Sequence, residues 1–183
     1  MKSNLIIIFS LFILVSSCKK QTLPKPKALL RLDYPKATYD LYAQSNYQFL
    51  KNDAAKASVQ KNEDIDLEYT TMKATIYISY KQVNNNIEQL LKDAQKLTYE
   101  HVVKADNIVE QPFVNKKDKV YGMFYKVSGN AASQSQFYVT DSTQHFLTGS
   151  VYFYAKPNYD SIYPAAMYLE NDIRKIMESI QWK

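Results

Sequence analysis

The chain has 183 residues, which is enough for one domain or at most two small ones. Hydrophobic residues make up 46% of it and charged residues 22%, so an ordered core is expected. The net charge of +5 is too small to indicate nucleic acid as a partner, and it fits an anionic membrane or polymer nearby. With only 3 Gly, 1 Cys and 2 His, the chain cannot build a glycine-rich phosphate loop, a thiolate zinc site, an iron–sulfur cluster or a disulfide framework.

Residues 1–17 are predicted to be a lipoprotein signal peptide. Leu5 to Val15 is an apolar run broken only by Ser10, too short for a bilayer core that needs about 20 helical residues. It fits the apolar region of a secretory signal. The small residue Ser17 precedes Cys18, as in the bacterial lipobox. We therefore expect cleavage after Ser17 and acylation of Cys18 with palmitate and related chains. An ordinary signal peptide with a chance cysteine is the alternative.

Residues 18–30 are predicted to be a lipid-anchored tether rich in proline and lysine. Pro24 and Pro26 favour an extended backbone. Each buried CH₂ group contributes about 0.8 kcal/mol, so two or three acyl chains hold a protein at a membrane almost permanently. Lys19 directly after the cysteine is typical of lipoproteins of the outer membrane, and the lack of acidic residues after it favours the periplasmic face. The lysines of the tether either rest on anionic head groups or are simply solvated.

Residues 31–183 are predicted to form a single α+β domain. A first strand is expected at residues 47–51. A second strand is expected at residues 67–81, where Met72, Ala74, Ile76, Ile78 and Tyr80 alternate with Lys73, Thr75, Tyr77 and Ser79, which is the signature of a half-buried strand. The asparagines at 84–86 offer a helix cap, and an amphipathic helix is expected from Asn86 to about Val102.

Four further strands are expected at residues 108–114, 119–127, 134–140 and 146–155. Pro112 assigns the first of them to an edge, because proline cannot donate to a neighbouring strand. Short connections favour an antiparallel sheet of about five to six strands with both amphipathic helices on one side. This order of elements resembles the PsbP/Mog1-like fold.

A final helix is expected from about residue 160 to residue 180. Asp160 or Ser161 is predicted to cap it, with Pro164 in its first turn, where no amide donor is missed. Its apolar stripe then packs on the sheet, and Trp182 is expected to pack there as well.

Asp141, Ser142 and His145 are the one group that resembles a catalytic site. A Ser/His/Asp triad needs side chains that converge from different directions, whereas these three share one predicted hairpin, whose turn chemistry explains them. His101 falls on an apolar helix stripe and is expected to be packed. We therefore predict no catalytic residue, no metal site, no small-molecule substrate, and no cofactor beyond the covalent lipid on Cys18. A carboxylate pair for cleavage of glycans stays open.

Two surfaces are candidates for binding a protein partner. One combines the loop from Gly129 to Ser133 with the hairpin from Asp141 to His145, because small residues allow close backbone approach; a plain structural turn is the alternative. Its candidate residues are Gly129, Asn130, Ser133, Asp141, Ser142 and His145. The other is a tyrosine-rich sheet face, which binds a partner if it is open and is core if it is covered. Its tyrosines are Tyr77, Tyr121, Tyr125, Tyr138, Tyr152 and Tyr154.

Short motifs cover nearly the whole chain and are densest between Tyr121 and Trp182. They are the lipobox, Pro24-Lys25-Pro26, Ala74-Thr75-Ile76, Ser79-Tyr80-Lys81, Tyr121-Gly122-Met123, Gly129-Asn130-Ala131-Ala132-Ser133, Gln136-Phe137, Thr140-Asp141-Ser142, His145-Phe146-Leu147, Tyr152-Phe153, Pro157-Asn158 and Gln181-Trp182-Lys183. Together they resemble the gliding-motility lipoprotein GldD family of the Bacteroidetes. The resemblance implies a non-enzymatic accessory lipoprotein of gliding, tied to type IX secretion, which acts with other envelope lipoproteins or proteins. The family brings no catalytic residues.

Two alternative functions stay open. An envelope enzyme or glycan-binding module acting on peptidoglycan or polysaccharide would show a deep cleft with convergent acids. A ligand carrier would show a large enclosed apolar cavity. Asp141-Ser142-Thr143 and Asp160-Ser161-Ile162 also match the O-glycosylation pattern of Bacteroidetes, with Ser142 and Ser161 as acceptors, although a turn and a helix cap explain both.

Overall fold

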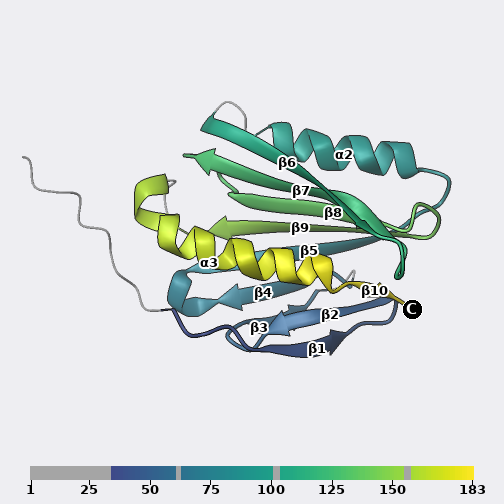
Figure 1. Cartoon of the computed structure of the whole chain (residues 1–183), viewed down its shortest axis with the longest axis horizontal. Helices are drawn as coiled ribbons and strands as arrows, with labels where there is room; N and C mark the ends of the chain where they lie inside the picture. The colour runs from purple at the N-terminus through teal and green to yellow at the C-terminus, as the bar shows by residue number, and fades with distance from the viewer. Residues whose placement is uncertain (1–33, 61–62, 101–103, 155–157) are drawn as a thin grey trace, which may run out of the picture.

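The computed structural model describes residues 34–60, 63–100, 104–154 and 158–183 (Figure 1). The predicted signal peptide and tether, with Cys18, lie outside these residues. The same holds for residues 31–33 of the predicted domain, for His101, and for the predicted helix and strand ends at 102 and 155.

The fold is α+β and antiparallel, as the sequence predicts, but its large sheet has seven strands instead of the expected five to six. The strand order is β3-β4-β5-β9-β8-β7-β6. The strands are β3 (Lys56–Val59), β4 (Ile65–Tyr69), β5 (Ala74–Gln82), β6 (Ala105–Asn115), β7 (Val120–Gly129), β8 (Ser135–Thr140) and β9 (His145–Phe153). β6 is an edge strand, in agreement with Pro112.

A separate three-stranded sheet lies beside the large one (Figure 1). It consists of β1 (Tyr39–Ala43), β2 (Tyr47–Asn52) and β10 (Gln181–Trp182), in the order β1-β2-β10. Among these strands the sequence predicted only β2, because β1 is largely exposed and β10 has two residues. Trp182 pairs with Tyr47 of β2 and so belongs to this small sheet.

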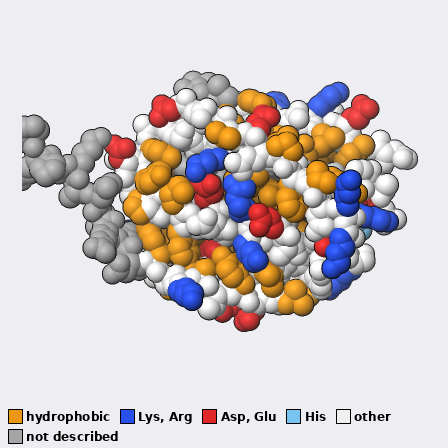
Figure 2. All heavy atoms as spheres, in the orientation of Figure 1, with side chains coloured by type: hydrophobic (Ala, Val, Ile, Leu, Met, Phe, Trp, Pro, Cys, Tyr) orange, Lys and Arg blue, Asp and Glu red, His pale blue; other side chains and the backbone are white. Residues whose placement is uncertain are grey.

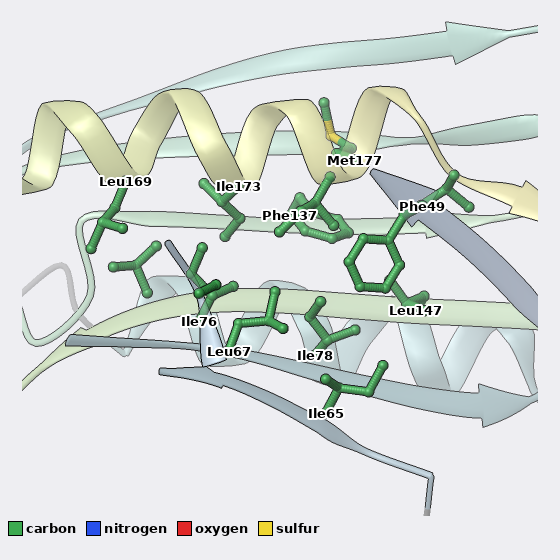
Figure 3. Packing of buried hydrophobic residues seen from close by; sticks show 14 of the residues in the cluster. Phe49, Ile65, Leu67, Ile76, Ile78, Phe137, Leu147, Leu169, Ile173 and Met177 are labelled. Atoms are coloured by element: carbon green, nitrogen blue, oxygen red, sulfur yellow. The ribbon is translucent and has the colours of Figure 1, made fainter. Parts of the chain in front are cut away.

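The main core lies between the large sheet and α3 (Tyr159–Glu178). Figure 3 shows Leu169 and Ile173 of α3 pointing toward the isoleucines and leucines of the sheet, and Met177 of the same helix belongs to the same cluster. Phe49 of β2 enters the same cluster, so the small sheet and the helix share one apolar interior. Burial of this side-chain area is the dominant favourable term in folding.

The second helix, α2 (Ile87–Tyr99), packs on the opposite face of the large sheet. Neighbouring residues of a strand point to opposite faces. In β9, Leu147 joins the cluster under α3, while Phe146 packs with Leu90 of α2 and with Tyr138 of β8. The prediction that both helices cover one side is therefore wrong, because β8 and β9 are buried on both faces, with polar as well as apolar side chains under α2.

Two predicted elements have different boundaries in the structure. The strand predicted at residues 67–81 is interrupted by a 3₁₀ turn at Thr70–Met72, after which Lys73 adopts a left-handed conformation with φ 49°. The last helix begins at Tyr159 with Asn158 as its cap, so Pro164 lies in the second turn rather than the first. Ser161 bonds back to the carbonyl oxygen of Asn158 and does not cap the helix.

A buried carboxylate ties α3 to the small sheet. Asp172 of α3 is 1% exposed; its two oxygens accept hydrogen bonds from the Tyr39 hydroxyl and the Asn52 amide, each at 2.6 Å. The Tyr69 hydroxyl is buried beside it without reaching hydrogen-bond geometry among the described residues. Burial raises the pKa of the Asp172 carboxyl above its ordinary 3.8, although the hydrogen bonds act in the opposite direction.

We expect Asp172→Ala to lower the free energy of unfolding by about 2 kcal/mol at neutral pH, because it leaves buried donors unpaired. Asp172→Asn keeps both bonds if its amide donates to the Tyr39 oxygen and accepts from Asn52, so its stability should stay close to that of the unmodified chain. Because the folded state holds the Asp172 proton more tightly than the unfolded state, stability should fall as the pH rises through the raised pKa. Urea unfolding across pH measures this slope. A slope at Asp172→Asn equal to that of the unmodified chain would contradict the assignment.

Candidate binding surfaces

The structure does not bring the six residues of the predicted binding loop together. Gly129, Asn130 and Ser133 precede β8, whereas Asp141, Ser142 and His145 follow it. The strand between them has 6 residues. At about 3.3 Å per residue, the two groups are roughly 20 Å apart at opposite ends of the sheet. They cannot contact one small partner segment at the same point.

The loop from Gly129 to Ser133 has a structural role. The Asn130 side-chain oxygen accepts a hydrogen bond of 2.9 Å from the backbone amide of Tyr159, the first residue of α3. Ser133 is fully buried and donates to the carbonyl oxygen of Ser135. Gly129 has φ 98°, and a Cβ there would lie 2.6 Å from the Asp106 nitrogen, so only glycine fits. The loop holds the start of α3 against the ends of β7 and β8.

The hairpin between β8 and β9 is organised by one carboxylate. An oxygen of Asp141 accepts backbone hydrogen bonds from Thr143, Gln144 and His145 at 3.0, 2.8 and 2.8 Å. Burial alone would raise the pKa of Asp141, but these bonds outweigh it and lower the pKa to about 2. Ser142, at φ 71°, donates its amide to the Thr140 hydroxyl. This is the turn chemistry that the sequence suggested as the alternative to catalysis.

The contacts of the His145 ring differ from those that a catalytic triad requires. Its Nδ1 atom and the Tyr80 hydroxyl share a hydrogen bond of 2.9 Å. Its ring stacks on the Trp182 indole with centroids 5.0 Å apart and an angle of 8°. The Asp141 carboxylate binds the backbone amide of His145, not the imidazole. The sequence missed Tyr80 and Trp182 as neighbours of His145, because both come from distant strands.

A pocket of about 390 Å³ opens beside this histidine. Three segments form its wall: the turn between β6 and β7, the turn between β8 and β9, and β10. Its lining residues are Lys117, Asp118, Lys119, Asp141, Gln144, His145, Gln181, Trp182 and Lys183. Figure 2 shows several Lys and Arg side chains gathered at this end of the molecule, where Figure 1 places the C-terminus. The pocket is defined by geometry that the sequence alone did not indicate.

Part of the predicted tyrosine-rich face is open. Tyr77 of β5 and Tyr154 after β9 are 38% and 61% exposed. The Tyr154 hydroxyl lies 2.5 Å from the Thr75 hydroxyl and 3.4 Å from that of Tyr77. The Tyr77 and Tyr152 rings meet edge to face at 5.8 Å. We call these four residues the tyrosine patch. The hydrogen bond with Tyr154, followed by burial, raises the pKa of Tyr77 to about 12, so the Tyr77 hydroxyl keeps its proton at neutral pH.

The other predicted tyrosines are at least partly enclosed. Tyr125 is 2% exposed, and Tyr138 packs against the cluster under α2. Tyr121 is half-buried. The space between α2 and this part of the sheet holds a cavity of only about 10 Å³, which is room for roughly one water molecule. This region of the sheet is core, as the sequence allowed.

No helix within the described ranges is long and apolar enough to cross a membrane. Across residues 34–60, 63–100, 104–154 and 158–183, no three His, Cys, Asp or Glu side chains gather in a way that could hold a metal ion.

The chain belongs to the family described as gliding motility lipoprotein GldD, which it matches over residues 19–182. This confirms the family resemblance inferred from the sequence motifs. Membership makes the chain a lipoprotein of the gliding motility apparatus and implies a membrane-anchored place in the cell envelope. A search of curated proteins finds none that matches the chain.

We expect Asp141→Ala to lower the free energy of unfolding by about 1–2 kcal/mol at pH 7, because three amides of the turn lose a charged acceptor. Asp141→Asn, which keeps a neutral acceptor, should lose less. Since the folded pKa is depressed, the stabilisation is present above the ordinary pKa of 3.8 and disappears as the pH falls through about 2. Thermal unfolding of both variants from pH 7 to pH 2 checks this. A stability difference that does not shrink in acid would contradict it.

Proposed function

We propose that this chain is a non-catalytic accessory lipoprotein of the outer membrane that serves gliding motility, and the type IX secretion linked to it, by binding another protein of the envelope. Acyl chains on Cys18 anchor it, residues 18–30 tether it, and a single domain from residue 31 onward faces the periplasm. The observation that carries the binding role is the open tyrosine patch.

The composition of the patch fits a protein partner. Tyrosine combines a large apolar ring with a polar tip, loses little conformational entropy, and is enriched at the centres of interfaces. Next to the patch on the same face, Asp66 and Glu68 of β4 lie directly opposite Tyr77 and Thr75 of β5. Aromatic rings flanked by two carboxylates complement a partner surface that carries Lys or Arg.

The anchor strengthens such an interface without enlarging it. A domain held near a membrane meets other membrane-bound proteins at a high effective concentration. A small patch with a few aromatic contacts then suffices for an association that would be weak between free proteins.

The acids of the pocket lack the features of hydrolytic catalysis. A general acid needs a raised pKa, whereas hydrogen bonds lower the pKa of Asp141 to about 2. The carboxylate of the other acid, Asp118, accepts a hydrogen bond from the Asn115 side-chain amide, and the Asp118 backbone amide donates to the Asn115 side-chain oxygen, so the pair closes its own turn. These bonds favour structural roles for both carboxylates and support the non-enzymatic proposal.

A photo-crosslinking residue in place of Tyr77 or Tyr154 should form an adduct with one envelope protein of the gliding or secretion machinery in intact cells. Tyr163 of α3, which is 43% exposed and outside the patch, is the matched control position. Tyr77→Ser with Tyr154→Ser should also abolish gliding while thermal unfolding still shows a folded domain, since interface tyrosines often contribute about 2 kcal/mol. Equal adducts at Tyr163, or normal gliding of the double variant, would refute the patch as the binding surface.

Cys18→Ala tests the anchor independently of the patch. We expect the variant to lack acyl chains by mass spectrometry, to leave the membrane fraction and to lose gliding, because the buried hydrocarbon no longer holds it. A soluble variant that supports full gliding would show that proximity to the membrane is not the purpose of the lipid. An unmodified chain without acyl groups would overturn the anchor itself.

A further inference from the structure

We infer that the pocket between the two hairpins and β10 is a binding site for an acidic sugar, that is, a saccharide unit with one carboxylate and several hydroxyls. This site is separate from the tyrosine patch. β9 runs from His145 at the pocket to Phe153, next to the patch residue Tyr154, so the two surfaces lie at opposite ends of that strand. The sequence predicted no small-molecule ligand, because the three pocket segments are far apart along the chain.

The first argument is the pattern of charges in the pocket wall. Three lysines and two aspartates line it, which leaves one net positive charge. Both aspartates accept hydrogen bonds from their own turns: Asp141 from three amides, and Asp118 from Asn115. The side-chain ammonium groups of Lys117 and Lys119 make no hydrogen bond or ion pair with any described residue, since the bond of Lys119 to Trp182 is through its backbone carbonyl oxygen. Their ammonium groups remain available to one anionic group of a ligand.

The second argument is the state of His145, which is only 8% exposed and lines the pocket. Its Nδ1 atom is bound to the Tyr80 hydroxyl, whereas its Nε2 atom has no hydrogen-bond partner in the described part of the chain. Five side-chain atoms of the described residues are fully buried without a hydrogen-bond partner, and Nε2 is not one of them. It therefore keeps some contact with the open space of the pocket. A nearly buried ring nitrogen at a pocket wall satisfies its hydrogen-bonding capacity through a ligand or solvent.

The third argument is the rigidity of the wall. The Trp182 indole nitrogen donates to the Lys119 carbonyl oxygen at 3.1 Å, and the ring stacks on His145. Lys183 donates to the Gln44 carbonyl oxygen at 2.7 Å. These contacts join the end of the chain at β10 to the turn that carries Lys119 and to the turn between β1 and β2. The pocket is therefore formed before any ligand arrives, which reduces the entropy cost of binding.

The chemistry of the lining favours a sugar over a peptide or a bare anion. Besides the lysines, the wall offers the side-chain amides of Gln144 and Gln181, which are partners for hydroxyl groups. A peptide with several acidic residues would be repelled by Asp118 and Asp141. A bare phosphate, which lacks a ring, would leave most of the wall without a contact. The volume of about 390 Å³ lies at the lower end of the range for small-ligand pockets, about 300–1,000 Å³.

The chain provides its own probe, because Trp182 is the only tryptophan and lies in the pocket wall. We would titrate the full-length protein in detergent with glucuronate and with glucose, which differ by one carboxylate, and follow tryptophan fluorescence. Inorganic phosphate and a glutamate-rich peptide are the other probes. Calorimetry with the same four compounds detects binding that leaves the fluorescence unchanged.

We expect saturable binding of glucuronate, with glucose weaker by about tenfold or more, because glucose lacks the carboxylate that makes charge-assisted hydrogen bonds to the lysines. Lys117→Gln with Lys119→Gln should reduce the affinity for glucuronate by a similar factor. Lys116→Gln, an exposed lysine of the same turn outside the pocket, should leave it unchanged. All three positions are exposed, so the variants should fold normally.

Several outcomes would overturn the inference. Equal affinity for glucose and glucuronate would remove the role of the lysines. Phosphate or the acidic peptide binding as tightly as glucuronate would remove the role of the sugar. Loss of binding in Lys116→Gln equal to that in the double variant would point to general surface charge, and no binding of glucuronate by either method would exclude the site.

Discussion

The structure depends on strands β8 and β9 being buried on both faces. In each strand the alternate side chains divide between two apolar clusters, a large one under α3 and a smaller one under α2. Gly149 of β9 is packed so tightly that a Cβ would lie 2.2 Å from the Phe137 ring. These two strands occupy the middle of the sheet. They therefore determine the positions of the hairpin that joins them, of the helix on each face, and of the strands on either side.

Because the centre of the large sheet is buried, binding surfaces can form only at the ends of the strands and on the part of the sheet that no helix covers. The tyrosine patch lies beside one end of β9, and the pocket with His145 lies at its other end. Neither surface needs a moving part. The patch is held by hydroxyl contacts among Thr75, Tyr77 and Tyr154, and the pocket by the stacking of His145 on Trp182. A rigid domain with two such surfaces suits a component that positions other molecules in an assembly.

Local patterns in the sequence predicted the strands and helices better than their arrangement. The alternation at residues 74–81, the edge position signalled by Pro112 and the turn at Asp141 were read correctly, because each depends on residues close together in the chain. The side on which each helix packs was not, since the residues of β8 and β9 that face α2 are largely polar, for example Gln136 and Ser150, and gave no indication of a second buried face. The 3₁₀ turn at Thr70–Met72 was not predicted either, although the apolar side chains change from odd positions (Leu67, Tyr69) to even positions (Met72, Ala74) across it.

The candidate sites divide in the same way. The hairpin residues around Asp141 could be selected from the sequence, and so could the tyrosines. The pocket could not, because Lys119, His145 and Trp182 become neighbours only when three separate segments meet. The sequence likewise gave no reason to connect Asn130 with Tyr159, a contact that turns a proposed binding loop into a support for α3.

The pairing of β10 with β2 has a consequence for how the protein is made. Gln181 and Gln48, which pair in the small sheet, are 133 residues apart. Ribosomes produce the chain from its N-terminus, so nearly all later residues are synthesised before β10, the second partner of β2, is present. Until then Tyr47 and Phe49, which are fully buried in the finished domain, stay partly exposed to solvent. The small sheet is therefore completed only once residue 182 is present, and a chain truncated before β10 leaves the apolar side chains of β2 incompletely buried.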